Sequence, residues 1–197
     1  MSPSNIIVAG DSAGGNLALQ FASQFLHPHP SLPTLRLPSH AKAETDGNSS
    51  EFPEAFGGML LISPWVEFNA DAPSFSRNSA RDFLPPRVWQ VSGDIVREGI
   101  VPALHNHLEP GIAPDGWWKG LGQVFPRVLI TAGEYEAMVD PIQRTGAVIA
   151  EEVKDTTVFV LPGGVHEDFI EAFASGEGER GDDYKLVVSW VLASLKL

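Results

Sequence analysis

A serine near the start of the chain lies between two glycines in a Gly-x-Ser-x-Gly pattern. The serine is Ser12, and Gly10 and Gly14 are the two glycines. A hydroxyl is a weak nucleophile at neutral pH, but small neighbours permit a tight strand-to-helix turn that exposes it to a substrate. Asp11 would complete this turn, and the backbone N–H of Ala13 would donate to a developing oxyanion. The pattern predicts a nucleophile elbow; the alternative is a glycine-rich turn without chemistry.

A nucleophilic serine needs a base, and histidine is the usual one. His166 follows an apolar run and a Gly-Gly turn near the C-terminus, where a loop would reach the sheet edge that carries the sites of α/β proteins. We therefore expect His166 to be the base. The remaining five histidines lie in or beside a proline-rich segment or form a His-Asn-His pair without a further ligand at metal-binding spacing: His27, His29, His40, His105 and His107.

The third member of such a site is a carboxylate that holds the histidine. Two candidates, Glu136 and Asp140, follow the third apolar run of the chain. Either one gives the order serine, acid, histidine, which is the order of α/β-hydrolase triads. Chymotrypsin-like proteases share the local serine pattern but place histidine and aspartate first, and no histidine precedes Ser12. Both carboxylates stay open at this point.

Strand and helix patterns alternate along the chain, which indicates an α/β fold with a mostly parallel sheet flanked by helices. β-branched and apolar runs predict strands at 6–9, 56–62, 127–132 and 156–161. Helical spacing predicts a helix after the elbow that ends before Pro28, and further helices near 86–98, 141–154 and 182–195. These elements would bring the carboxyl ends of the strands, and the candidate residues beside them, to one edge.

We expect a single domain over residues 1–197 with two distinctive segments. Residues 27–53, rich in proline and polar residues, predict an irregular insertion, and residues 64–122 predict a helical, cap-like region. Large aromatic residues are frequent in the second segment and predict either an apolar substrate pocket or ordinary core packing: Trp65, Phe68, Trp89, Trp117 and Trp118.

Composition excludes several classes of protein. The 197 residues include 25 acidic and 13 basic side chains, for a net charge of −12, which disfavours binding to nucleic acid. Without cysteine, the chain has no disulfide framework, thiolate metal site or cysteine nucleophile. No apolar run reaches the roughly 20 residues of a membrane-spanning segment, and we see no targeting segment, so an intracellular location is the default expectation.

Five motifs together resemble one family over essentially the whole chain. They are Gly-Asp-Ser-Ala-Gly-Gly-Asn-Leu-Ala at 10–18, Ile-Ser-Pro-Trp at 62–65, Trp-Lys-Gly-Leu at 118–121, Ala-Gly-Glu-Tyr-Glu at 132–136 and Pro-Gly-Gly-Val-His at 162–166. The chain resembles the hormone-sensitive-lipase-like esterases, the α/β hydrolase fold-3 group, and within it the fungal steryl acetyl hydrolase-like branch. The resemblance implies a serine carboxylic-ester hydrolase for a small or short-chain ester, with no metal or organic cofactor. Carried over to this chain, it favours Glu136 over Asp140 as the acid.

The sequence also departs from that family. Its members place several strands and a His-Gly-Gly-Gly oxyanion motif before the elbow, whereas here the elbow begins at Gly10 and His-Gly-Gly does not occur. We therefore expect the C-terminal portion of an α/β-hydrolase fold, with the amide of Ala13 as the main oxyanion donor. Because loss of one such donor costs about 10²–10³ in rate, the alternative is a catalytically impaired fragment or pseudoenzyme.

Overall fold

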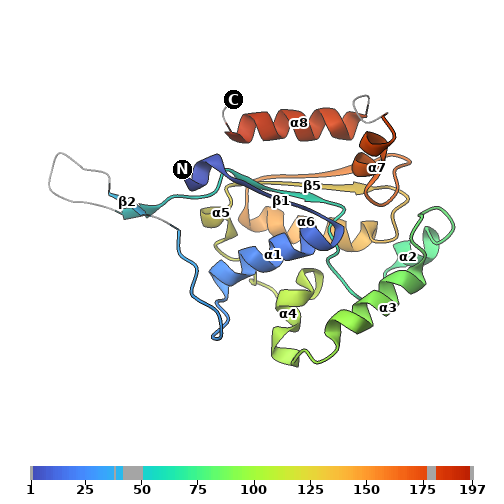
Figure 1. The fold of residues 1–197 in the computed structure, drawn as a ribbon, viewed down its shortest axis with the longest axis horizontal. Helices are drawn as coiled ribbons and strands as arrows, with labels where there is room; N and C mark the ends of the chain where they lie inside the picture. The colour runs from blue at the N-terminus through green and yellow to red at the C-terminus, as the bar shows by residue number, and fades with distance from the viewer. Residues whose placement is uncertain (1, 38, 42–50, 177–180, 196–197) are drawn as a thin grey trace.

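In the computed structural model, which describes residues 2–37, 39–41, 51–176 and 181–195, a parallel sheet forms the centre of the protein. Its four strands, in the spatial order β1-β4-β5-β6, are β1 (Ile7–Asp11), β4 (Gly58–Ile62), β5 (Arg127–Gly133) and β6 (Asp155–Leu161). Each neighbouring pair is parallel, so all four carboxyl ends lie at the same edge (Figure 1). The expected α/β fold with a mostly parallel sheet is confirmed.

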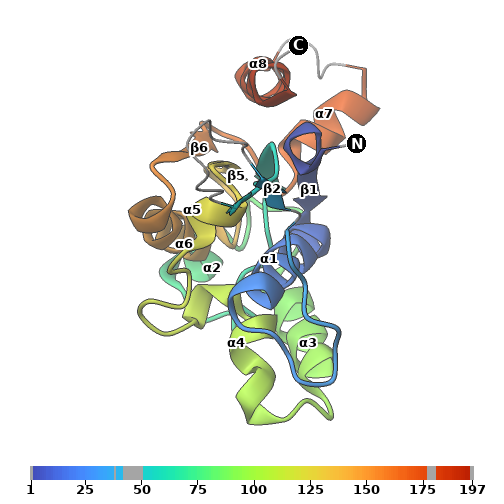
Figure 2. The same cartoon turned by 90° about the vertical axis from the view of Figure 1, so that its left-hand side faces the viewer.

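Helices cover both faces of this sheet. Figures 1 and 2 show α7 (Asp168–Ala174) and α8 (Asp182–Leu195) on one face, and α1 (Ser12–Leu26), α5 (Leu121–Val124) and α6 (Val139–Glu152) on the other. Successive side chains of a strand point to opposite faces, so each central strand contributes to two cores.

The two cores follow this alternation residue by residue. Leu60 and Leu129 pack with Trp190 of α8, whereas Met59 and Leu61 belong to the larger core on the α1 and α6 side. All four strand residues are almost fully buried. Strands buried on both faces explain why the sequence shows continuous apolar runs there instead of an alternating pattern.

The chain between β4 and β5 contains several short helices separated by loops. Its elements are α2 (Pro73–Arg77), α3 (Pro86–Arg97), η2 (Pro102–Leu104), α4 (His105–Leu108), η3 (Pro110–Ile112) and α5. In Figure 1, α3 and α4 lie below α1, and α2 and α3 lie at the right, toward the carboxyl ends of the strands. The description of residues 64–122 as a cap-like region stays a prediction.

Some short elements were not predicted. Within residues 27–53, expected to be irregular, β2 (Ser39–Ala41) pairs antiparallel with β3 (Glu51–Pro53); residues 38 and 42–50 lie outside the described part. The two-turn helix α7 and the short η1 (Pro3–Asn5) also went unpredicted. Elements this short do not span enough residues to show a hydrophobic period.

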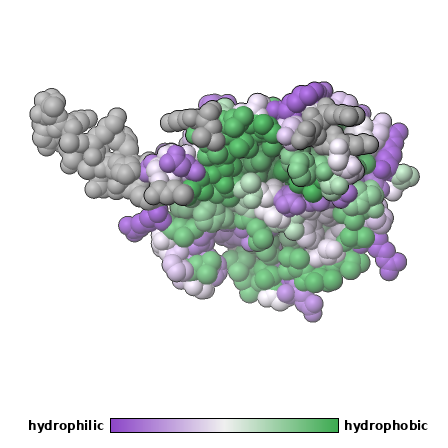
Figure 3. All heavy atoms as spheres, turned by 45° about the horizontal axis from the view of Figure 1, so that its top comes forward, coloured by the Kyte–Doolittle hydropathy of each residue, from purple (hydrophilic) through white to green (hydrophobic). Residues whose placement is uncertain are grey.

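Apolar surface gathers on the face that carries α8 (Figure 3). Exposed apolar side chains there include Val188 and Leu192 of α8 and Ile6 beside β1. Strand β1 is at the end of the sheet, with no strand on its outer side in the part of the chain that the structure describes. Of the described helices, none is long and apolar enough to cross a membrane.

Candidate active site

Ser12 lies at the turn from β1 into α1, where the backbone is forced into an uncommon conformation. Its φ is 45°, a left-handed value that is rare for a residue with a side chain and frequent at functional sites. The turn is so tight that a Cβ on Gly10 would overlap the backbone of Gly14. Trp65, in the loop after β4, fixes the turn, because its N–H donates to the carbonyl of Ser12 at 2.9 Å. The turn at Ser12 therefore has the backbone geometry of a nucleophile elbow.

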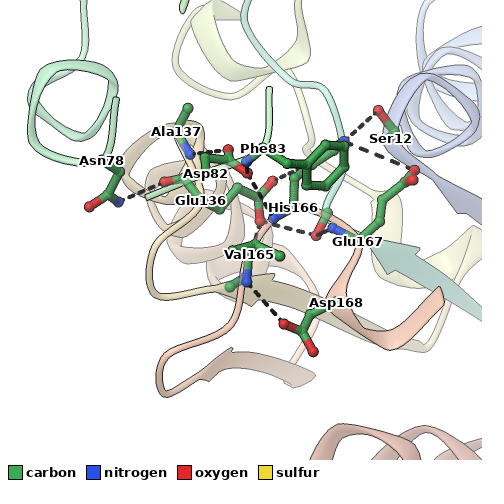
Figure 4. A network of polar contacts seen from close by, with 12 residues as sticks. Ser12, Asn78, Asp82, Phe83, Glu136, Ala137, Val165, His166, Glu167 and Asp168 are labelled. Carbon is green, nitrogen blue, oxygen red and sulfur yellow. Dashed lines mark hydrogen bonds and ion pairs between the residues drawn. The ribbon is translucent and has the colours of Figure 1, made fainter. Parts of the chain in front are cut away.

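His166 connects the serine to a carboxylate. Its Nε2 lies 2.9 Å from Oγ of Ser12, and its Nδ1 lies 2.7 Å from Oε1 of Glu136 (Figure 4). The side chains of His166 and Glu136 are 1% and 0% exposed, whereas Ser12 is half-buried. The structure thus brings the three residues together with only the serine open to solvent.

Close approach of two loops places the acid beside the base. A Cβ on Gly133 would overlap the backbone at Gly164, so only glycine permits the loop after β5 to touch the loop after β6 this closely. The N–H of Tyr135 donates to the carbonyl of Gly164 at 2.7 Å, and the N–H of Gly163 donates to the carboxylate of Glu134 at 2.8 Å. These contacts fix Glu136 and His166 relative to each other.

The second carboxylate oxygen of Glu136 also accepts hydrogen bonds. Its Oε2 accepts a hydrogen bond from the hydroxyl of Ser63 and another from the N–H of Gly133, each at 3.0 Å. Burial raises the pKa of Glu136, while the hydrogen bond and charge of His166 and the hydrogen bonds from Gly133 and Ser63 oppose that rise. The motif around Ser63 entered the resemblance, but its contact with the acid was not foreseen.

Asp82, between α2 and α3, ties the two loops together from outside the sheet. Its Oδ1 accepts from the N–H of His166 at 3.2 Å, and its Oδ2 accepts from the N–H of Ala137 at 2.7 Å. Asn78 supports the same loop by donating its amide to the carbonyl of Glu136 at 2.9 Å. Neither residue carries a motif that would have identified it from the sequence.

Several acidic groups act on the His166 imidazole. Burial lowers the pKa of His166, but the hydrogen bond and charge of Glu136, with the charges of Glu167 and Asp82, outweigh burial and hold this pKa above its usual value. The ring therefore holds a proton more strongly than a free imidazole does. Such a base is suited to accept a proton from a serine hydroxyl and to be stabilised as imidazolium.

The alternative acid, Asp140, lies in a different arrangement. Its carboxylate pairs with Arg77 at 2.7 Å and accepts the N–H of Ser74 at 2.9 Å, so it joins α6 to α2. The Arg77 guanidinium holds the pKa of Asp140 below its usual range. The described contacts of Asp140 are structural, and Glu136 is the carboxylate at Nδ1 of His166.

The remaining histidines with described side chains lie away from Ser12. His27 stacks on Trp117 with ring centroids 3.8 Å apart, and His107 contacts the same indole edge to face at 5.1 Å. Burial lowers the pKa of His107, and the nearby charges of His27 and His29 lower it further. His105 begins α4, and His40 lies in β2.

Aromatic side chains form an apolar wall beside the base. Trp89 of α3 contacts the His166 ring edge to face with centroids 4.8 Å apart, and Phe83 lies 6.0 Å from it. Phe83 is half exposed, whereas Trp89 is buried. Trp65 and Phe68 pack with Trp89 in the core. Of the five aromatic residues singled out in the sequence, Trp89 is the one in described ring contact with His166.

A large cavity lies elsewhere in the described part of the molecule. About 680 Å³ in volume, it is lined by residues of α1, the following loop and the η2–α4 region, including Phe21, Gln24, Leu32 and Leu104. Ser12 is not among its lining residues. The cavity is therefore separate from the serine–histidine pair.

Ala13 and Gly14 lie in the first turn of α1, immediately after the nucleophile. Backbone N–H groups in the first turn of a helix have no acceptor within the helix and point toward its N-terminal end. The helix dipole adds positive potential at the same end. This is the environment that an oxyanion on a carbonyl attacked by Ser12 would meet.

Comparison with known proteins defines the class. Residues 1–170 match the family model described as alpha/beta hydrolase fold. The chain therefore belongs to the α/β hydrolases, in the third group of that fold, which is the family that its motifs predicted. No match was found among curated proteins.

Solved structures show the same fold. A hormone-sensitive lipase from a metagenome library has a TM-score of 0.69 and 22% identity, over 98% of this chain and 55% of its own. EstE5 has a TM-score of 0.70 and 21% identity, over 100% and 55%. Carboxyl esterase 2 from the mycorrhizal fungus Tuber melanosporum has a TM-score of 0.66 and 17% identity, over 100% and 54%. The chain thus spans about half the length of these structures.

Proposed function

We propose that the protein is a serine carboxylic-ester hydrolase in which Ser12 is the nucleophile, His166 the base and Glu136 the acid. The observation that carries the proposal is the pair of contacts on one imidazole, 2.9 Å to Ser12 and 2.7 Å to Glu136. A carboxylate on Nδ1 keeps the proton there and leaves Nε2 free to accept one. The kinship with structures named as lipases and esterases supports the same chemistry.

In the first half of the reaction, Oγ of Ser12 attacks the ester carbonyl carbon while its proton passes to Nε2 of His166. The carbonyl oxygen becomes an oxyanion, which the N–H of Ala13 stabilises. The tetrahedral intermediate collapses, the C–O bond to the alcohol breaks, and the alcohol leaves with the proton from Nε2. An acyl group remains on Ser12.

The second half repeats the chemistry with water. Nε2 of His166 removes a proton from the water, and the resulting hydroxide attacks the acyl carbon. The proton then returns to Oγ of Ser12 as the carboxylic acid product leaves. Glu136 stays ionised and stabilises the imidazolium in both halves. The buried position of His166 and Glu136 strengthens their mutual attraction.

A small or short-chain, largely apolar ester is the proposed substrate class. Phe83, which is half exposed beside His166, offers an apolar surface of limited extent, which favours such a group. Membership of the fungal steryl acetyl hydrolase-like branch is part of the same proposal and rests on the motifs alone.

The test is active-site labelling with a fluorophosphonate, followed by peptide mass spectrometry. We expect an adduct on Ser12 that His166→Ala abolishes and that His105→Ala, which changes a histidine of α4, leaves intact. A folded chain that forms no adduct would contradict the proposal and favour the alternative, a catalytically impaired hydrolase. An adduct on another residue would also overturn the assignment of Ser12.

A further inference from the structure

Glu167, the residue after the base, is held in an unusual backbone conformation. Its φ is 55°, which is uncommon for a residue with a side chain. Its N–H donates to the hydroxyl of Ser63 at 3.1 Å, and that hydroxyl donates to Glu136 at 3.0 Å. The same hydrogen-bonded chain that orients the acid therefore also fixes the position of Glu167.

The Glu167 side chain turns back toward the reacting nitrogen. Its Oε1 lies 4.0 Å from Nε2 of His166, the atom that also faces Ser12 at 2.9 Å (Figure 4). Glu136, by contrast, binds Nδ1 on the other side of the ring. The Glu167 side chain is 19% exposed, so its carboxylate borders the space that a substrate at Ser12 would enter.

A second acid lies against Glu167. Asp11, the residue before the nucleophile, is one of the acidic groups that act on the Glu167 carboxyl. Burial, opposed by the charge of His166 and reinforced by Asp11, raises the pKa of Glu167. The charged groups that face Glu167 are thus Asp11 from β1, Glu136 from the loop after β5 and His166 beside it.

We propose that Glu167 is a specificity-determining residue that selects esters by charge: the site takes uncharged or cationic esters and rejects those with an anionic group near the scissile carbonyl. This inference rests on the proposed esterase function. An anion bound at Ser12 would lie within several ångströms of the Glu167 carboxylate in a partly desolvated site. Repulsion of two like charges at about 6 Å corresponds to roughly 3- to 100-fold in rate, depending on the local dielectric.

The test compares three 4-nitrophenyl esters whose acyl chains match in shape and differ in charge. The cationic ester is 4-(trimethylammonio)butanoate, the uncharged one 5,5-dimethylhexanoate and the anionic one 4-sulfobutanoate. For each, kcat/KM is measured at pH 8 and low salt from release of 4-nitrophenolate. The unmutated protein is expected to prefer the cationic over the anionic ester, and Glu167→Gln is expected to reduce that preference about tenfold.

Glu171→Gln is the matched control, because it removes the same charge from an exposed position one turn further along α7. It should leave the preference within about twofold, and 0.5 M NaCl should weaken the preference of the unmutated protein. Circular dichroism checks that each variant is folded.

The possible outcomes separate the two claims. Hydrolysis of all three esters with the same charge preference in Glu167→Gln as in the unmutated protein overturns the role of Glu167 and leaves the esterase intact. A preference for the anionic ester overturns it as well. If the folded protein hydrolyses none of the esters and forms no fluorophosphonate adduct, the proposed function fails and charge selection fails with it.

Discussion

The hydroxyl of Ser63 donates a hydrogen bond to Oε2 of Glu136 at 3.0 Å, at the carboxyl end of β4. Ser63 itself has a φ of 45°, and Ser12 and Glu167 are the other described non-glycine residues with positive φ. All three lie around His166. Backbone strain of this kind persists only where the surrounding contacts hold the residue in place. Here those contacts converge on one site.

Ser63→Ala should therefore weaken the site without removing any proposed catalytic group. The change deprives Glu136 of one donor and leaves the N–H of Glu167 without its acceptor, which typically costs about 1–3 kcal/mol of unfolding free energy. We expect kcat to fall about tenfold with little change in KM. Urea unfolding and ester hydrolysis measure the two effects. Ser79→Ala, at an exposed serine whose hydroxyl contacts the Ser76 carbonyl, is the control.

The choice between Glu136 and Asp140 is tested by two isosteric amide substitutions. Glu136→Gln replaces the acceptor at Nδ1 of His166, and in a serine triad this kind of change lowers kcat by about 10⁴. Asp140→Asn removes an ion pair with the exposed Arg77, and such surface pairs contribute little to stability, so activity should stay within about threefold. Equal losses of kcat in the two variants would contradict the assignment of Glu136.

The pH profile of kcat/KM should show an acidic limb above pH 6.5. The neutral imidazole is the active base, so activity rises as His166 loses its proton, and its pKa lies above the usual value because of Glu136, Glu167 and Asp82. Glu167→Gln removes one of these charges and should move the limb toward lower pH. A profile whose acidic limb stays in place in that variant would show that Glu167 does not act on the imidazole.

Removing the Asp82 carboxylate should loosen the loop after β6, which carries His166. In Asp82→Ala the N–H groups of His166 and Ala137 lose a charged acceptor, and hydrogen bonds to charged groups contribute about 1.5–3 kcal/mol each. We expect a fall of at least 2 kcal/mol in unfolding free energy together with a lower kcat. Asp94→Ala, at an exposed position of α3, gives the reference for an aspartate outside the site. Unchanged stability in Asp82→Ala would contradict this role.

The sequence by itself determined the class of fold and predicted the candidate residues for its chemistry. Apolar runs of strand length that alternate with helical patterns predict a parallel α/β sheet, because propensity and periodicity are properties of neighbouring residues. The same local signals identified Ser12 in a strand-to-helix turn and His166 after a Gly-Gly turn. The family match over residues 1–170 confirms the class.

Only the tertiary structure decided which side chains meet. Glu136 and Asp140 are four residues apart and equivalent by spacing, yet the close contact of Gly133 with Gly164 brings Glu136 to His166. Ser63 lies 73 residues before Glu136, and Asp82 lies 55 residues before Ala137, yet both contact the loop after β5. Such long-range contacts depend on how loops pack after the sheet has formed, and no period or motif in the chain encodes them.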